Sequence, residues 1–448
     1  MLMAENAVAL CAVGAEKTVS NELKKLGLQI IESGFGRVRF RTDLAGLYRA
    51  LMGLRAADRI LLEAACFTAA DFDALFEGVR DVPWEDYIPR MSGLRVAKVR
   101  TNRSRLEAET SIQAVVHKAA AERLCQKWGV SRLPGGSLDP STSGKFSNSG
   151  FTGGKYKDAY HSRLIKNASP PPPENEAELR VYIEKDQVSI LLDLSGEPLF
   201  KRGYRTMGGT APLRETTAAA IILYSGWRRK YSLYDPFCGS GTIAIEAAMY
   251  AWDIAPGIGR HFALERLLLC DRGVEQNVRK EFLEKVDFSR PVRIGGSDND
   301  AGVVAAARSN MTRALALAGR KEADTVPVFR QCSMDTATPP EGFLAKAGYD
   351  TVPEKEFQNS RESENTRDGE CEGFIITNPP YGRRLGDTAT AEETYREMGK
   401  LTRHFSGWKL ALISDHPGFE SFFGRKADSC REITNGAIHS YFYEYNSL

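Results

Sequence analysis

Between residues 231 and 416, short apolar stretches alternate with helical ones, and this alternation restricts the fold more than any other feature of the sequence. Buried-strand patterns such as YSLYDPF, VRIGGSDND and GFIITNPP are separated by helical patterns such as GTIAIEAAMYA and AGVVAAARSNMTRALAL. Strands that alternate with helices at this spacing predict a parallel α/β sheet covered on both faces. Such sheets bind ligands at the carboxyl ends of their strands, so the residues that follow each strand are candidates for a site.

The stretch DPFCGSGT, residues 235–242, joins the first of these strands to a helix through a glycine-rich turn. Gly239 and Gly241 allow close backbone approach to a ligand, and the start of the helix can face a polar group. The pattern is neither GxGxxG nor GxxxxGK[ST], which disfavours a dinucleotide or an ATP phosphate. With Asp235 beside the loop, a cationic ligand such as S-adenosylmethionine fits better than a pyrophosphate. The residues expected to bind it here are Asp235, Pro236, Gly239, Gly241 and Thr242.

Acidic residues also follow the next two strands. GGSDND ends the second strand with Asp298 and Asp300, and CSMD ends the third with Asp335. A carboxylate at the end of the second strand can bind both hydroxyls of a ribose. One residue suffices for that role, so we expect Asp298 to bind the ribose and Asp300 to cap the following helix. Asp335 is placed to accept a hydrogen bond from an adenine amino group.

The stretch TNPPYG, residues 377–382, follows the strand GFIIT. It places an amide, a kinked backbone and an aromatic ring at the carboxyl end of that strand. These groups suit the binding of a flat, nitrogen-bearing ring, although a proline-rich exit from a strand would look the same. We expect the catalytic residues to lie here.

The N-terminal part of the chain has another pattern. The first sixty residues read as strand, helix, strand, helix, with the first helix ending at Gly27 and the second capped by Asp43. The next part contains the strand GLRVAKVRTNRSRL, a long helix with Ser111 as its cap, and a hairpin that turns near Asp186. We therefore expect two small α+β units, the second closing near Gly196, before the α/β domain.

Basic residues concentrate in the second of these units. The whole chain of 448 residues has a net charge of only +2, but residues 90–170 contain fifteen Lys or Arg and five Asp or Glu. A basic segment on a near-neutral protein predicts a polyanionic partner such as RNA, although a solvated surface has the same composition. The residues expected to contact RNA here are Arg95, Lys98, Arg100, Arg103 and Arg105.

Composition limits the remaining possibilities. The eight cysteines are scattered without a CxxC pair, which indicates neither a zinc site nor a disulfide framework and fits a reducing cytosol. We expect a cytoplasmic protein with no metal and no membrane segment, since the sequence has neither a basic leader nor an apolar run of about 18 residues. Residues 137–154, rich in Ser, Gly and Thr, predict a mobile loop, and the acidic residues 350–372 predict a disordered insertion.

The order and spacing of these motifs carry a family resemblance. Asp235–Thr242, Asp298 and Asn378–Tyr381 resemble the successive signatures of Rossmann-like class I methyltransferases that act on amino groups. The stretch from Leu199 to Trp227 resembles the segment before the methyltransferase domain in the RlmL/YpsC-like family. The resemblance covers nearly the whole chain and is weakest over the basic unit.

This resemblance implies a ferredoxin-like unit at residues 1–65, a THUMP RNA-binding domain at 66–198 and an S-adenosylmethionine-dependent methyltransferase domain at 199–448. It implies methylation of guanine N2 in large-subunit (23S) ribosomal RNA. In the family, the asparagine side chain and the first proline carbonyl accept from the target amino group, and the aromatic ring stacks on the flipped base. The catalytic residues implied here are Asn378, Pro379, Pro380 and Tyr381.

Some alternatives stay open. Arg202 and Arg205 either contact RNA or join domains. The NPPY motif suits any planar amine, so an adenine-N6 methyltransferase acting on DNA or RNA is a rival. A glutamine methyltransferase of release factors is another, but the basic unit argues against both a DNA and a protein substrate. A non-catalytic RNA-binding factor of ribosome assembly belongs to a different class, which the three polar strand ends disfavour.

Overall fold

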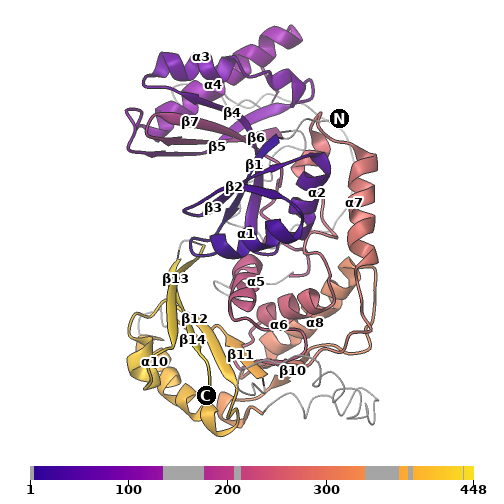
Figure 1. Ribbon diagram of the computed structural model, residues 1–448, viewed down its shortest axis with the longest axis vertical. Coiled ribbons are helices and arrows are strands. Elements are labelled where there is room, and N and C mark those ends of the chain that lie inside the picture. Colours follow the sequence, from indigo (N-terminus) through magenta and orange to yellow (C-terminus); the bar gives the residue numbers. More distant parts are fainter. Residues whose placement is uncertain (1–4, 135–175, 206–212, 339–372, 382–386, 437) are drawn as a thin grey trace, which may run out of the picture. The chain divides into compact units, whose positions relative to one another are not determined.

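The computed structural model describes residues 5–134, 176–205, 213–338, 373–381, 387–436 and 438–448. The chain divides into two compact units (Figure 1). The first comprises Met1–Leu62, Leu194–Phe262 and Asp271–Leu448, and the second comprises Glu63–Asp193 and Ala263–Cys270. The stretches 137–154 and 350–372, for which a loop and an insertion were predicted, lie outside the described residues.

The large sheet of the first unit confirms the predicted α/β fold. Its strands follow the order β10-β9-β8-β11-β12-β14-β13, and the first five are parallel neighbours. Each polar strand end singled out in the sequence therefore lies at the same edge. The parallel strands and the helices between them are β8 (Ser232–Asp235), α6 (Thr242–Ala251), α7 (Arg272–Glu284), β9 (Ile294–Asp298), α8 (Ala301–Leu317), β10 (Val328–Gln331), η4 (Met334–Thr336), β11 (Gly373–Thr377), α10 (Asp387–Met398), η6 (Gly399–Arg403) and β12 (Lys409–Ser414).

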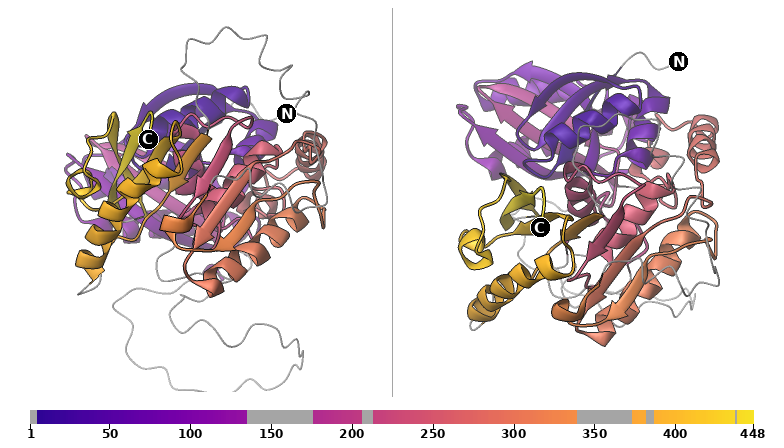
Figure 2. Two further views of the ribbon diagram at one scale, coloured as in Figure 1. Left: turned by 90° about the horizontal axis from the view of Figure 1, so that it is seen from below. Right: turned by 60° about the horizontal axis from the view of Figure 1, so that its bottom comes forward.

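The sequence reasoning did not anticipate the end of this sheet. Two antiparallel strands, β13 (Ser429–Asn435) and β14 (Ile438–Tyr445), pair with each other and join the sheet at β12 (Figure 2). Helix α5 (Glu215–Tyr224) precedes β8, and α11 (Phe419–Phe423) follows β12. The alternation in IHSYFYEY is the ordinary pattern of a half-buried strand, so the sequence could have predicted β14.

The N-terminal part of the first unit is a small α+β structure with antiparallel strands in the order β2-β3-β1-β4. The predicted cap is confirmed, because the Asp43 carboxylate accepts from Gly46 N over 2.8 Å. Two strands were missed, since β2 is mostly exposed and β4 lacks a regular alternation of buried and exposed residues. The elements are β1 (Glu5–Cys11), α1 (Glu16–Lys25), β2 (Gln29–Gly34), β3 (Arg37–Thr42), α2 (Leu44–Gly53) and β4 (Ala57–Thr68).

Hydrogen bonds between distant parts of the chain tie this α+β part to the large sheet within the first unit. Thr434 N of β13 donates to Val13 O over 3.0 Å, and Gly257 N donates to Met52 O over 2.8 Å. The Thr216 hydroxyl of α5 donates to Asp58 over 2.6 Å. The first sixty residues are therefore packed into the body that carries the large sheet.

The second unit contains the end of β4 and strands β7, β6 and β5 in that order. The predicted hairpin is confirmed, with Val181 opposite Ile190. The predicted Ser111 cap is wrong, because the helix begins two residues earlier and Ala108 precedes it without a side-chain hydrogen bond. The elements are α3 (Phe72–Arg80), η1 (Trp84–Asp86), β5 (Gly93–Asn102), α4 (Glu109–Trp128), β6 (Glu176–Glu184), β7 (Gln187–Asp193) and η3 (Ala263–Arg266).

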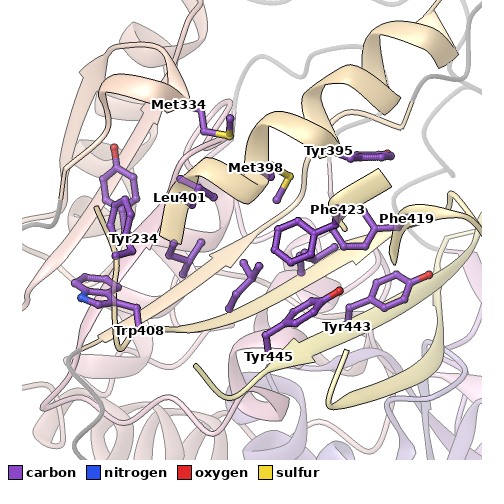
Figure 3. Close-up of a cluster of buried hydrophobic side chains, with 14 of the residues drawn as sticks. Tyr234, Met334, Tyr395, Met398, Leu401, Trp408, Phe419, Phe423, Tyr443 and Tyr445 are labelled. Atoms are coloured by element: carbon purple, nitrogen blue, oxygen red, sulfur yellow. The ribbon is translucent and has the colours of Figure 1, made fainter. Parts of the chain in front are cut away.

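An aromatic-rich core supports the carboxyl half of the large sheet. Figure 3 shows it between α10, which carries Tyr395 and Met398, and strand β14, which carries Tyr443 and Tyr445. The Tyr395 and Phe419 rings meet edge to face with their centroids 5.0 Å apart, a favoured aromatic geometry. Burial of this many large rings fixes α10 on the sheet, and α10 begins just after the NPPY turn.

Candidate active site

The carboxyl ends of three adjacent parallel strands bring together the main residues predicted from the sequence. Asp235 ends β8, Asp298 ends β9, and Asn378 directly follows β11. Since β8 pairs with β9 on one side and with β11 on the other, Asp235 lies between the other two. A ligand at this edge can contact all three residues.

Asp235 is the most deeply buried acid of this site, with 1% of its surface exposed. Its Oδ1 atom accepts from the Thr377 hydroxyl over 2.6 Å and from Phe237 N over 3.1 Å. Burial raises the pKa of Asp235 to about 7, and the nearby Asp298 charge also raises it, while the two hydrogen bonds lower it. A buried carboxylate that is costly to ionise favours a cationic partner.

The loop between β8 and α6 has the backbone that the glycine pattern predicts. Gly239 and Gly241 have φ values of 50° and 85°, a region that residues with side chains rarely adopt. A Cβ on Gly241 would lie 3.0 Å from Ala307 Cβ, so the loop is packed closely against α8. Gly239 N donates to Asp298 Oδ2 over 3.1 Å, which joins the loop to the end of β9. Pro236 is buried at the start of the loop.

The two acidic residues after β9 have separate positions, as expected. Asp300 caps α8, with its carboxylate accepting from Gly302 N over 2.6 Å. Asp298 is partly exposed and faces the glycine loop. Asp335 lies exposed in η4, after β10, and the Ser333 hydroxyl lowers its pKa. Asp298, partly exposed, and Asp335, exposed, therefore lie at the same edge of the sheet as Asp235.

Cys238, inside the same loop, is buried, and burial raises the pKa of its thiol well above the ordinary value. A thiol in this environment stays protonated and is a poor nucleophile. The site therefore has no activated cysteine at this position.

The NPPY turn is held by a residue that the sequence reasoning missed. The Tyr395 hydroxyl of α10 donates to Pro380 O over 2.7 Å and lies 3.3 Å from Ser414 Oγ at the end of β12. The Tyr381 hydroxyl donates to Asn378 Oδ1, so the ring of Tyr381 lies beside the amide. Pro379 is buried. The stretch LISDH ends a predicted strand, and the rule applied to Asp235 and Asp298 would have identified Ser414.

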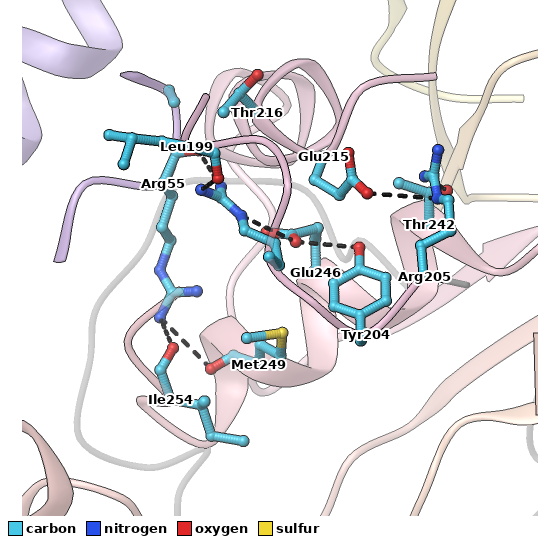
Figure 4. A network of polar contacts seen from close by, with 12 residues as sticks. Arg55, Leu199, Tyr204, Arg205, Glu215, Thr216, Thr242, Glu246, Met249 and Ile254 are labelled. Carbon is cyan, nitrogen blue, oxygen red and sulfur yellow. Dashed lines mark hydrogen bonds and ion pairs between the residues drawn. The ribbon is translucent and has the colours of Figure 1, made fainter. Parts of the chain in front are cut away.

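Burial and hydrogen bonding correct the prediction that Arg202 contacts RNA. Its side chain is 1% exposed, and its Nε lies 3.5 Å from Glu246 Oε1, to which the Tyr204 hydroxyl also donates (Figure 4). Arg202 also donates to Leu199 O over 2.7 Å and to Arg55 O. Arg202 is therefore too deeply buried to contact RNA. It joins the N-terminal α+β part to α6, which agrees with the alternative that this arginine joins parts of the protein.

Arg205 is also used inside the protein rather than at its surface. Its Nε lies 3.3 Å from Glu215 Oε1, and its Nη2 donates to Leu213 O and to the Thr242 hydroxyl (Figure 4). Only 13% of the side chain is exposed, and its contact with RNA stays a prediction. Arg205 instead fixes Thr242 at the first turn of α6, beside the glycine loop.

The other basic candidates lie on or just after β5 in the second unit. Arg95 pairs with Glu176 and Glu178 at 3.0 and 2.7 Å, Arg100 pairs with Glu109 at 3.2 Å, and Arg105 lies 3.6 Å from Asp186. Arg103 is exposed with a φ of 49°, and Lys98 is half-buried. These residues are accessible, but acidic neighbours offset three of the five charges. Their contact with RNA stays a prediction.

Within the part of the chain that the structure describes, no helix is both long enough and apolar enough to cross a membrane. No group of three or more His, Cys, Asp or Glu side chains among those residues is arranged to hold a metal ion.

Comparisons with known proteins extend these observations. Residues 202–322 and 346–443 match the model of the RMKL-like methyltransferase domain, and residues 6–61 match the RlmL ferredoxin-like domain. YpsC of Bacillus subtilis (strain 168), whose name provisionally calls it an RNA methyltransferase, is 31% identical over 98% of this chain and 95% of its own length. The ribosomal RNA large subunit methyltransferase K/L of Marinomonas sp. (strain MWYL1) is 26% identical over 98% of this chain. The chain spans only 52% of the length of that relative.

A solved structure agrees over the whole chain. SMU.472, provisionally described as a methyltransferase and crystallised with S-adenosylhomocysteine, superposes with a TM-score of 0.74 at 31% identity. The match covers 100% of this chain and 99% of that one.

Proposed function

Because the chain belongs to the RlmL/YpsC-like family of methyltransferases, we propose that it methylates the N2 amino group of a guanine in 23S ribosomal RNA. The methyl donor is S-adenosylmethionine, whose sulfonium supplies an electrophilic methyl group. The observation that carries the proposal is the placement of Asp235, Asp298 and Asn378 on three adjacent strand ends.

The residues at this edge fit the donor. Its ammonium is a suitable partner for the buried Asp235, and its ribose hydroxyls are suitable partners for the accessible Asp298. The glycine loop would let the backbone approach the donor closely, because Gly239 and Gly241 have no side chain and adopt positive φ values. Asp335, farther along the edge, would accept a hydrogen bond from the adenine amino group of the donor.

Asn378 and Pro379 supply what the acceptor requires. The Asn378 Oδ1 atom and the Pro379 carbonyl are two acceptors for the hydrogens of one exocyclic amino group. Accepting both hydrogens would aim the nitrogen lone pair at the methyl carbon, so that an N–C bond forms as the S–C bond breaks. The extra proton then leaves the product nitrogen for solvent. Such a reaction depends on positioning more than on a strong base. Tyr381 would stack on a guanine turned out of its helix.

Two observations support RNA as the acceptor molecule. The basic residues of β5, in the predicted THUMP domain at 66–198, are accessible and could contact phosphates. The names of the relatives refer to RNA and to large-subunit ribosomal RNA.

Mass spectrometry of ribosomal nucleosides tests this proposal. We expect 23S RNA from a strain lacking the gene to lose one N2-methylguanosine, and the purified protein to restore it in vitro with S-adenosylmethionine. The Asn378→Ala protein is the matched control and should not restore it. Loss of N6-methyladenosine instead would establish the rival adenine activity. A gene deletion that changes ribosome assembly but no nucleoside would favour the non-catalytic role.

A further inference from the structure

Thr377 connects the two halves of the site described above. It is the last residue of β11, it is fully buried, and it directly precedes Asn378. Its hydroxyl donates to Asp235 Oδ1 over 2.6 Å, across 142 residues of sequence. One short hydrogen bond thus joins the residue before the amine acceptor to the carboxylate of the glycine loop.

The hydrogen bond from Thr377 is the polar contact that links the Asp235 carboxylate to β11. Phe237 N donates to the same Oδ1 atom, so Oδ2 takes part in neither hydrogen bond. Among the residues that the structure describes, the ionisable groups that face Asp235 are Asp298 from β9 and the Cys238 thiol from the loop, and neither attracts a negative charge. Oδ2 is therefore the atom available to the ammonium of the methyl donor.

The side-chain type suits a positioning role. A β-branched residue on a strand has a restricted χ1 angle, so the threonine hydroxyl is held in one direction. Any shift of Asp235 is then transmitted to the backbone at Asn378. Methyl transfer is sensitive to such shifts, because a misplacement of about 1 Å can lower a rate by about 10²-fold.

We propose that Thr377 is a positioning residue that sets Asn378 relative to the methyl donor through Asp235. Donor binding and acceptor geometry are then linked by one hydrogen bond. The part that concerns Asn378 rests on the proposed methyl transfer, whereas the part that concerns Asp235 requires only that the donor binds.

Three variants separate the hydroxyl from the rest of the side chain. Thr377→Val removes the hydroxyl and keeps the shape, Thr377→Ser keeps the hydroxyl, and Thr377→Ala avoids crowding if the valine protein does not fold. Thr312→Val is the matched control, since Thr312 is exposed on α8 and its hydroxyl bonds only to the local Arg308 O.

The first measurement is the affinity for S-adenosylhomocysteine by calorimetry between about pH 5.5 and pH 8.5. The parent affinity should rise with pH as Asp235 ionises. Loss of a hydrogen bond that favours the carboxylate should move the midpoint of this rise upward by about one pH unit in Thr377→Val and Thr377→Ala. Thr377→Ser and Thr312→Val should keep the parent midpoint. A lower melting temperature with an unchanged midpoint would mean a merely structural role and would overturn the proposal.

The second measurement is the single-turnover rate of RNA methylation with saturating donor at high pH, where Asp235 is ionised in every variant. We expect a decrease of tenfold or more in Thr377→Val and a rate within about twofold of the parent in Thr377→Ser. Equal rates in the two variants would overturn the link to Asn378. If the parent binds S-adenosylhomocysteine but methylates no RNA, the proposed function fails while the pH measurement still decides the role of Thr377.

Discussion

Asn378 combines two properties that a methyl-accepting site needs, an acceptor oxygen and a fixed backbone. Removal of the amide by Asn378→Ala should lower the single-turnover rate by about 10²–10³, by analogy with the loss of one oxyanion donor. The affinity for S-adenosylhomocysteine should not change, because the residues proposed to bind the donor lie at or after the ends of β8, β9 and β10. Tyr381→Phe, which removes the hydroxyl that donates to Asn378 and keeps the ring, should be mild. Methylation by Asn378→Ala at the parent rate would contradict this role.

The pKa of Asp235 leads to a second prediction, about stability. In the unfolded chain this carboxyl ionises near pH 4, whereas in the folded protein its pKa is about 7. The folded state therefore holds the proton more tightly, and stability from this group is lost as the pH rises from about 4 to about 7. Asp235→Asn removes this dependence.

Urea titrations without ligand should show the difference. The free energy of unfolding of Asp235→Asn minus that of the parent should increase between about pH 4 and pH 7, by on the order of a few kcal/mol. S-adenosylhomocysteine should reduce the difference at pH 8, since it binds the ionised parent. A difference that is constant with pH would show that Asp235 ionises normally in the folded protein.

Sequence reasoning correctly located residues at the ends of strands, whereas their roles stay predictions. Asp235, Asp298 and Asn378 were identified in this way, and the structure brings them to one edge. It failed for Arg202, because the sequence does not distinguish an arginine buried against an acid from an exposed one. The roles of Thr377 and Tyr395 depend on partners from other strands and helices, which only the folded chain specifies.

At the scale of elements, Asp298 and Asp300, the acidic residues where β9 leads into α8, are expected to have different roles. Asp298→Ala should weaken S-adenosylhomocysteine binding, because it removes the carboxylate that faces the glycine loop. Asp300→Ala should leave that affinity nearly unchanged and lower the stability by about 1 kcal/mol, the usual cost of losing an N-cap. Calorimetry and urea denaturation measure the two effects. Equal affinities of Asp298→Ala and the parent would exclude the ribose role.

The contact between α6 and the N-terminal α+β part can be tested by its effect on stability. Arg202→Met would leave the Glu246 carboxylate buried without its ion-pair partner, which typically costs about 3–5 kcal/mol. Arg202→Met combined with Glu246→Leu removes both charges and should recover most of that loss. Urea denaturation followed by near-ultraviolet circular dichroism measures both proteins. A double variant as unstable as the single one would show that Arg202 acts through Leu199 O and Arg55 O instead.

At the scale of the whole molecule, local patterns predicted the order of the elements better than their grouping. The alternating strands and helices indicated the α/β sheet, and the two N-terminal α+β units were also recognised. The pattern gave no sign that residues 1–62 belong to one compact unit with the large sheet. That grouping depends on contacts such as Thr434 with Val13, which join residues more than 400 positions apart.

The charge distribution over the two units leads to the last prediction. RNA affinity should fall with salt because phosphate contacts release counterions. Replacement of Arg100, Arg103 and Arg105 by alanine should make the slope of log K against log salt less steep by at most about 2, since each contact to a single strand contributes about 0.7. Glu109 and Asp186 already offset two of these charges, so Arg103→Ala alone should account for the largest share.

Replacement of an acidic residue next to these arginines provides the control for this prediction. Glu109→Gln removes the partner of Arg100 and should increase RNA affinity at low salt. The affinity for S-adenosylhomocysteine should stay constant in all these variants, because β5 lies in the second unit and Asp235 in the first. Filter binding at several salt concentrations gives the slopes. If the triple variant keeps the parent slope and Glu109→Gln has no effect, the phosphates contact another surface, and the basic residues of β5 serve only to solvate the second unit.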